Sequence, residues 1–145
     1  CNIKYIDNNI SNQELVDAAD NLNDIVLKND KDYVINFDSQ FDNIQISNRQ
    51  IDIAVVSKEF FEQNFQYNMF LDLETLNGFS DLPLEKYGVM KKLDSSGKEG
   101  IYGIEAKDLN IIKDIHSGRD DDVLVVISNT DHNDEVMNVL KEFVK

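Results

Sequence analysis

Two short apolar runs constrain the fold of this chain more than any other feature of its sequence. The first spans residues 51–56 and is interrupted only by Asp52, and the second, VLVVIS, spans residues 123–128. A strand with one face in water alternates apolar and polar residues, whereas a strand covered on both faces is apolar throughout. The first run therefore predicts a strand in the middle of a sheet, and the second predicts another buried strand of the same kind.

Other segments bounded by turn residues predict further strands. Residues 2–7 alternate in the manner of a strand and run into Asn8 and Asn9, a pair typical of turns. A turn-rich spacer lies between two strand-like segments and predicts a β-hairpin inserted near residues 87–105. The full set of expected strands is 2–7, 32–38, 51–56, 69–73, 88–93, 100–105 and 123–128.

Capping residues and helical spacing predict the helices between these strands. In the first helix Ser11 and Glu14 form the pattern of a capping box. Leu15, Ala18, Leu22 and Ile25 then recur at helical spacing. Later helices are expected to begin at the N-caps Ser39, Ser57 and Asp131. The helix after Ser57 is expected over 58–65, and the last helix, after Asp131, turns Val136, Leu140 and Phe143 inward. A further short helix is expected over 107–115.

The order of these elements predicts the fold class. Strands that alternate with helices imply a largely parallel sheet, covered on both faces by helices in right-handed crossovers. We therefore expect an α/β fold, a three-layer αβα sandwich with a mostly parallel sheet. The chain has 145 residues, no internal repeat and no long polar linker, so residues 1–145 are expected to form one domain.

Composition excludes several classes of protein. Hydrophobic residues make up 41% of the chain and charged residues 29%, a globular balance, and no apolar run is long enough to span a membrane. With 14 basic and 28 acidic residues the formal net charge is −14, which disfavours nucleic acids and anionic membrane surfaces as partners. The single cysteine excludes an internal disulfide framework and a cysteine-rich zinc site.

No motif in the sequence carries an obvious chemistry. No glycine lies between the first strand and the first helix, so a phosphate-binding loop of the dinucleotide or P-loop type is unsupported. The only histidines, His116 and His132, both lie in polar loop contexts and far apart in sequence, which gives little support to a catalytic triad or a zinc site. We assign no catalytic residue and no cofactor.

Two acidic segments invite comparison with calcium loops. Asp131, Asn133 and Glu135 alternate polar oxygens, but this segment lacks the central glycine of a calcium loop, and acidic residues are also favoured at the start of a helix. The aspartates at residues 120–122 are expected to belong to a solvated loop. We assign no metal site.

Polar residues follow several expected strands at one edge of the sheet. In an open parallel sheet ligands bind beyond the carboxyl ends of the strands, where helix N-termini point. Serine and asparagine are also the ordinary caps of helices, so a purely structural role stays open. The ligand-binding candidates at this edge are Asp7, Asn8, Asn9, Ser39, Gln40, Ser57, Lys58 and Asn129.

Cys1 raises the question of where the protein resides. A cysteine at a mature N-terminus remains when a bacterial lipoprotein signal is cut, after which its thiol is acylated. Cys1 is therefore a candidate lipid attachment site, and it implies an extracellular protein attached to the cell membrane only through that anchor. The alternative is a cysteine that stands first in this sequence without any such role.

Three segments together resemble one family. The segments QIDIAVVSKEFFEQNFQYNMFLDLETL, GIYGIEAKDLNIIKDI and VLVVISNTDHNDEVMNVLKEFVK resemble parts of bacterial extracellular solute-binding proteins and of related membrane-attached proteins of Gram-positive bacteria. The resemblance covers most of residues 50–145 loosely. It implies a single lobe of the type II periplasmic binding fold, outside the cell, whereas usual members close two lobes on a ligand. No ligand-binding residue of the family has a counterpart in these segments.

Three functions remain open at this point. The first is a non-enzymatic, membrane-anchored module that binds a small polar solute or a peptide at the strand-end edge, which predicts a preformed polar concavity there. The second is a protein-interaction or structural module on the same scaffold, which predicts an exposed apolar patch or a homodimer. The third is a small hydrolase, which requires ionisable groups converging in one pocket. The sequence gives neither the ligand nor the oligomeric state.

Overall fold

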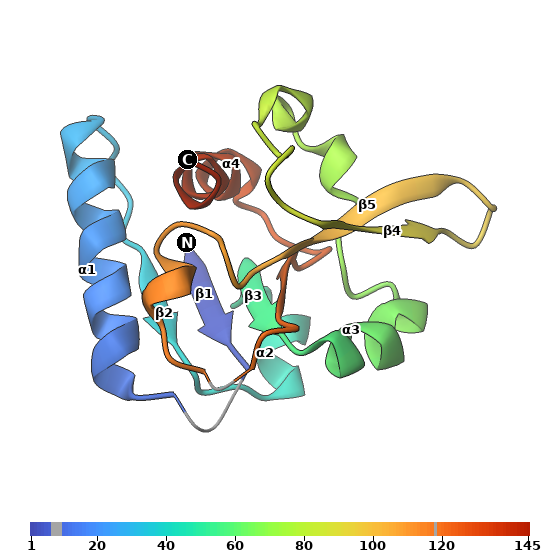
Figure 1. The fold of residues 1–145 in the computed structure, drawn as a ribbon, viewed down its shortest axis with the longest axis horizontal. Helices are drawn as coiled ribbons and strands as arrows, with labels where there is room; N and C mark the ends of the chain where they lie inside the picture. The colour runs from blue at the N-terminus through green and yellow to red at the C-terminus, as the bar shows by residue number, and fades with distance from the viewer. Residues whose placement is uncertain (7–9, 118) are drawn as a thin grey trace.

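The computed structural model describes residues 1–6, 10–117 and 119–145 of the chain. These residues form a six-stranded open sheet with the strand order β2-β1-β3-β6-β5-β4, together with four α-helices (Figure 1). The strands are β1 (Asn2–Tyr5), β2 (Asn36–Asp38), β3 (Ile53–Val56), β4 (Val89–Leu93), β5 (Glu99–Glu105) and β6 (Val123–Val126), and the helices are α1 (Asn12–Lys28), α2 (Asn43–Ser47), α3 (Lys58–Asn64) and α4 (Asn133–Phe143).

The two apolar runs form the centre of the sheet, as their sequences predict. Every residue of β3 and of β6 is buried, and the two strands pair with each other. Each is therefore covered on both of its faces. The hairpin β4–β5 is also confirmed, with a β-bulge between Met90 and Lys91.

The sheet is mixed, and the prediction of a mostly parallel sheet is wrong. β1 runs parallel to β2 and to β3, whereas the pairs β3–β6, β6–β5 and β5–β4 are antiparallel. For β6 to run parallel to β5, the connection between them would have to cross back to the edge of the sheet at which β5 begins. The expected helix over 107–115 would supply such a crossover, but the described part of that segment contains only the short 3-10 helix Ile112–Asp114. The chain therefore enters β6 from the edge at which β5 ends.

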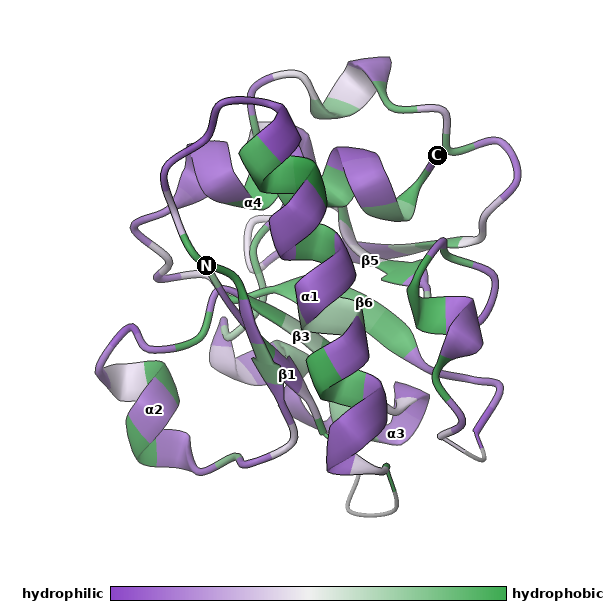
Figure 2. Cartoon of the chain, turned by 90° about the vertical axis from the view of Figure 1, so that its left-hand side faces the viewer, coloured by the Kyte–Doolittle hydropathy of each residue, from purple (hydrophilic) through white to green (hydrophobic). Residues whose placement is uncertain are grey.

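Helices cover both faces of the sheet. On one face α1 and α4 pack on Ile3, Tyr5 and neighbouring strand residues to form the larger core. On the other face Phe61 of α3 packs with Val125 and other residues in a smaller core. Figure 2 shows α1 lying across the sheet, and the residues of α1 that are buried are all apolar, among them Leu15 and Leu22. The layers agree with the predicted helix–sheet–helix arrangement.

Local capping differs from the expectation at three of the four predicted N-caps. Ser57 caps α3 as expected, because its hydroxyl accepts a hydrogen bond from the Phe60 amide at 3.1 Å. Ser11 stands at the N-cap of α1 but its side chain makes no capping hydrogen bond. The Glu14 carboxylate contacts His116, with Nδ1 and Oε1 2.6 Å apart. The capping box predicted for Ser11 is therefore not formed.

The other two predicted caps lie outside the helices they were expected to begin. Asp42, and not Ser39, caps α2, in a capping box with Gln45. His132 occupies the N-cap position of α4, and Asp131 forms an ion pair with Arg49 at 2.9 Å. In both cases the helix begins later than its first polar residue indicates.

One other segment is less regular than predicted. The expected strand over 69–73 is reduced to a single bridge between Phe70 and Ile127, and the 3-10 helix Leu73–Thr75 follows it. No helix in the described part of the chain combines the length and the apolar character that a membrane crossing needs.

Candidate functional site

The reversed direction of β6 divides the predicted ligand-binding residues between two edges. Ser39, Gln40, Ser57 and Lys58 follow β2 and β3 and lie at the carboxyl edge of the parallel strands, as expected. Asn129 follows the antiparallel β6 and therefore lies at the opposite edge, so its placement in the predicted site is wrong. Asp7, Asn8 and Asn9 lie outside the described residues.

The candidates at the carboxyl edge are partly occupied by structural roles. The Ser57 hydroxyl caps α3, and the Gln40 amide donates a hydrogen bond to Asp38 at 3.0 Å. At the opposite edge the Asn129 side chain donates to the Ile46 carbonyl at 2.8 Å. These contacts hold loops in place, which is the structural role left open from the sequence.

A buried polar cluster lies at the same carboxyl edge, centred on Asp122. Because Val123 at the start of β6 pairs with Val56 at the end of β3, the residue before β6 lies beside the end of the parallel strands. Asp122 is 2% exposed. Its Oδ2 accepts hydrogen bonds from the Tyr5 hydroxyl and, at 3.3 Å, from the Ser117 hydroxyl.

Arg119 supplies the positive charge of this cluster. Its Nε lies 2.8 Å from Oδ1 of Asp122, an ion pair whose geometry does not complete a hydrogen bond. Its Nη2 donates to the Ile6 carbonyl at 3.1 Å, and the guanidinium carbon lies 6.0 Å from the centre of the Tyr5 ring. Strand β1 and the segment before β6 are thus fastened together by one arginine.

Burial dominates the protonation behaviour of this cluster. It raises the pKa of the Asp122 carboxyl above its ordinary value, because the loss of hydration outweighs the hydrogen bonds from Tyr5 and the charge of Arg119. Burial, and then the hydrogen bond to Asp122, raise the pKa of the Tyr5 hydroxyl, which therefore keeps its proton at neutral pH.

An open groove of about 410 Å³ lies over this cluster. Tyr5 and Asp122 form part of its lining together with Arg119, and the segment that leads to β6 contributes the cations Lys107 and Lys113. Both lysines are exposed, and neither forms an ion pair with any residue that the structure describes. The rest of the lining is Ile112, Ile115, His116, Ser117 and Asp120.

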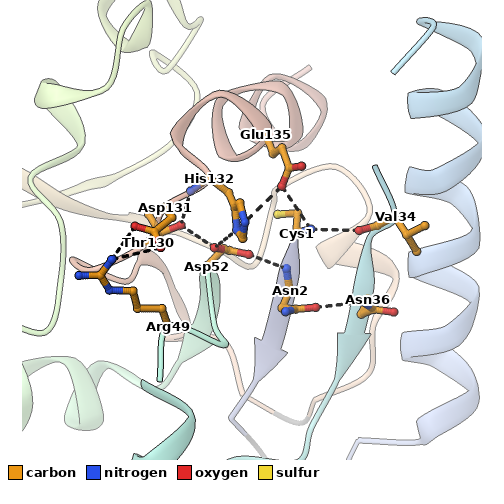
Figure 3. Close-up of polar contacts among 10 residues, drawn as sticks. All are labelled: Cys1, Asn2, Val34, Asn36, Arg49, Asp52, Thr130, Asp131, His132 and Glu135. Carbon is orange, nitrogen blue, oxygen red and sulfur yellow. Dashed lines mark hydrogen bonds and ion pairs between the residues drawn. The ribbon is translucent and has the colours of Figure 1, made fainter. Parts of the chain in front are cut away.

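A second polar cluster occupies the opposite edge of the sheet, centred on Asp52 (Figure 3). Asp52 is 1% exposed, and its Oδ2 accepts a hydrogen bond from the Asn2 amide at 2.8 Å. Its Oδ1 accepts from the Thr130 hydroxyl and lies 2.9 Å from Nδ1 of His132. Both carboxylate oxygens are therefore used to fasten β1 to the connection between β6 and α4.

Cys1 lies beside this second cluster. Its nitrogen donates to the Val34 carbonyl at 3.0 Å and lies 3.4 Å from Oε2 of Glu135 in α4. Its side chain packs against the larger core. Figure 3 shows Cys1 between the start of β1 and α4, on the far side of His132 from Arg49.

Sequence reasoning missed the residues that make the carboxyl-edge cluster. The aspartates at 120–122 were expected in a solvated loop; Asp120 and Asp121 are exposed, but Asp122 is buried, so the expectation is wrong for that residue. Its position directly before a buried strand was the available signal, because such a residue lies at the rim of the sheet. No comparable sequence signal predicts that Arg119 belongs to this cluster.

Neither metal ligation nor a known relative helps to define the site. Among the described residues no group of three or more histidine, cysteine, aspartate or glutamate side chains is arranged to hold a metal ion. Compared with models of protein families, with curated proteins and with solved structures, the chain finds no match in any of the three. The resemblance to solute-binding proteins therefore stays a prediction.

Proposed function

We propose that this chain is a non-enzymatic binding module that takes a small polar solute with an anionic group into the carboxyl-edge groove. The observation that carries the proposal is the meeting of Lys107, Lys113 and Arg119 around one groove, in a chain with twice as many acidic as basic residues. A volume of about 410 Å³ falls within the range of small-molecule sites, roughly 300–1,000 Å³.

The three cations contribute differently to this proposal. Arg119 is held by Asp122 and by the Ile6 carbonyl, so its position is fixed before any ligand arrives. Lys107 and Lys113 are exposed at the groove and have their ammonium groups available for a carboxylate or phosphate. A fixed guanidinium and two adaptable lysines together suit an anionic group on a small solute.

The proposal extends to fold family and location, where it depends on the sequence resemblance. A single lobe of a solute-binding protein, anchored outside a Gram-positive cell through Cys1, is consistent with a groove at the strand ends. In the structure Cys1 packs against the core, so attachment of a lipid requires this side chain to turn outward. Mass spectrometry of the protein from cell membranes, compared with Cys1→Ala, tests this part alone.

The groove is tested by calorimetric and thermal-shift titration with amino acids, organic acids, oligopeptides, sugars and inorganic phosphate. A bound ligand at 100 times its Kd adds about 2.7 kcal/mol to the free energy of unfolding, which corresponds to a shift of roughly 5–10 °C at this size. We expect an anionic member of the panel to bind. The double variant Lys107→Gln/Lys113→Gln should lose that shift, whereas Lys98→Gln, at the turn of the hairpin, should keep it. A panel without binders, or binding indifferent to both lysines, contradicts the proposal.

A further inference from the structure

We propose that Asn110 positions the two lysines of the carboxyl-edge groove. It fixes a strained turn at Ile111, and this turn brings Lys107 and Lys113 to the same anionic group. The inference rests on the proposed function, because it concerns how that groove holds its ligand. It goes further by naming a residue outside the lining of the groove, and a backbone conformation, on which the affinity for the anion depends.

The first observation is the backbone conformation of Ile111, which has a φ of +76° and a ψ of −50°. For a β-branched residue a positive φ is an outlier, which costs free energy and persists only where the surrounding structure enforces it. The apolar spacing of residues 107–115 is typical of a helix, but this conformation is incompatible with a right-handed helix. The chain therefore turns at Ile111, where its local pattern favours a continuous helix.

The interruption changes where the two lysines lie. In a regular helix, residues six positions apart point in directions about 120° apart around the axis. Lys107 and Lys113 are six positions apart, yet both line the groove. Two turns replace the helix: the Leu109 amide donates to the Ala106 carbonyl at 3.1 Å, and the Lys113 amide donates to the Leu109 carbonyl at 2.9 Å. Ile111 lies within the second turn, so its conformation sets the position of Lys113 relative to Lys107.

Asn110 ties this turn to the end of α4. Its backbone amide donates to the Phe143 carbonyl at 2.8 Å, and its side-chain amide donates to the Glu142 carbonyl at 3.2 Å. The last carbonyls of a helix have no partner within that helix, so the two bonds also satisfy α4. The Ile111 side chain is buried in the larger core. Together these contacts enforce the strained conformation.

The test measures the affinity for inorganic phosphate by isothermal titration calorimetry in a double-mutant cycle of Asn110→Ala and Lys113→Gln. Asn110→Ala should weaken phosphate binding about fivefold in the parent, but by less than about twofold in the Lys113→Gln background, because no ammonium is left there to be positioned. The matched control is Asn23→Ala in α1, which removes side-chain hydrogen bonds to the backbone of Ile35 at 2.8 and 2.9 Å. It should leave the phosphate affinity unchanged.

Backbone NMR of the free parent adds a measurement that needs neither a ligand nor a variant. Couplings and chemical shifts of Ile111 should give a positive φ. The inference is overturned by a negative φ, by equal losses from Asn110→Ala in both backgrounds, by an equal loss in Asn23→Ala, or by a parent that does not bind phosphate. The proposed solute site has its own criterion, an anion of the wider panel whose binding depends on the two lysines, so it can stand when this inference fails.

Discussion

Ser57 and Ser11 hold equivalent positions before their helices, but only one of the two hydroxyls has a partner there. Ser57 accepts the Phe60 amide, whereas Ser11 makes no capping hydrogen bond. Ser57→Ala should therefore lower the free energy of unfolding by about 1 kcal/mol, the usual cost of losing an N-cap, and Ser11→Ala should change it far less. Urea denaturation of the two variants measures the difference, and equal losses would contradict the assignment.

The contrast between these serines also marks a limit of local sequence patterns. Ser11 and Glu14 match a capping box, and nothing within the helix argues against it. In the fold the Glu14 carboxylate also contacts His116, which lies 102 residues away in the sequence. A pattern three residues long cannot register a partner that only the tertiary fold brings near, and the same holds for Asp131, which pairs with Arg49.

Burial of Asp122 gives the protein a pH dependence of known sign. Its pKa is raised above the ordinary value of 3.8, so between that pH and the higher pKa of the folded state the folded protein holds more protons than the unfolded protein. The free energy of unfolding contributed by this group therefore falls as the pH rises through that interval.

Asp122→Asn removes the titrating group and should weaken this fall, because the amide does not ionise. Thermal melts of the parent and the variant across that interval measure it, and the exposed Asp120→Asn serves as the matched control. If both variants kept the slope of the parent, the buried carboxyl would not be its source.

At the scale of elements, the sequence predicts burial better than direction. The apolar runs predict the central strands β3 and β6, and the turn-rich spacer predicts the hairpin, because both signals come from residues within the element. Strand direction depends on the connection, and the segment before β6 carries apolar spacing typical of a helix without forming one of useful length. Because β6 therefore runs antiparallel to β3, Asn129 lies at the edge opposite the carboxyl ends of the parallel strands, and Asp122 lies at the carboxyl edge.

Close packing between β5 and β6 gives a prediction at this scale. A Cβ on Gly103 of β5 would overlap the side chain of Val123 in β6, whereas Gly97 in the hairpin turn has free space but a φ of +85°. Gly103→Ala should lower the free energy of unfolding by roughly 1–3 kcal/mol, as overpacking does. Gly97→Ala should cost about 1 kcal/mol, through backbone conformation alone.

A second substitution, at Val123, distinguishes the loss caused by overpacking from the loss caused by backbone conformation. Val123→Ala makes room beside residue 103 and should recover part of the loss in Gly103→Ala, while it should add independently to the loss in Gly97→Ala. Denaturant titration of the three single and two double variants completes the comparison. Simple additivity in both pairs would show that Val123 is not the obstacle.

At the scale of the whole molecule, the expected site and the proposed groove lie at the same edge but share none of the residues that the structure describes. The rule that ligands bind beyond the carboxyl ends of parallel strands selects the edge of β1, β2 and β3 at which this groove lies. The groove itself is built by residues from the connection between β5 and β6, including Lys107, Lys113 and Arg119. Their convergence follows from the antiparallel entry into β6, which no local pattern encodes.

The place of β6 also bears on how the protein is made. Strands β1, β2 and β3 belong to the first part of the chain and the β4–β5 hairpin to the middle, yet the strand that joins these two groups is the last one in the sequence. Because β6 pairs with both β3 and β5, the two groups of strands cannot join into one sheet before residues 123–126 have emerged from the ribosome. Completion of the sheet is therefore a late event of synthesis, and a nascent chain stalled before that point lacks the strand that covers the inner edges of β3 and β5.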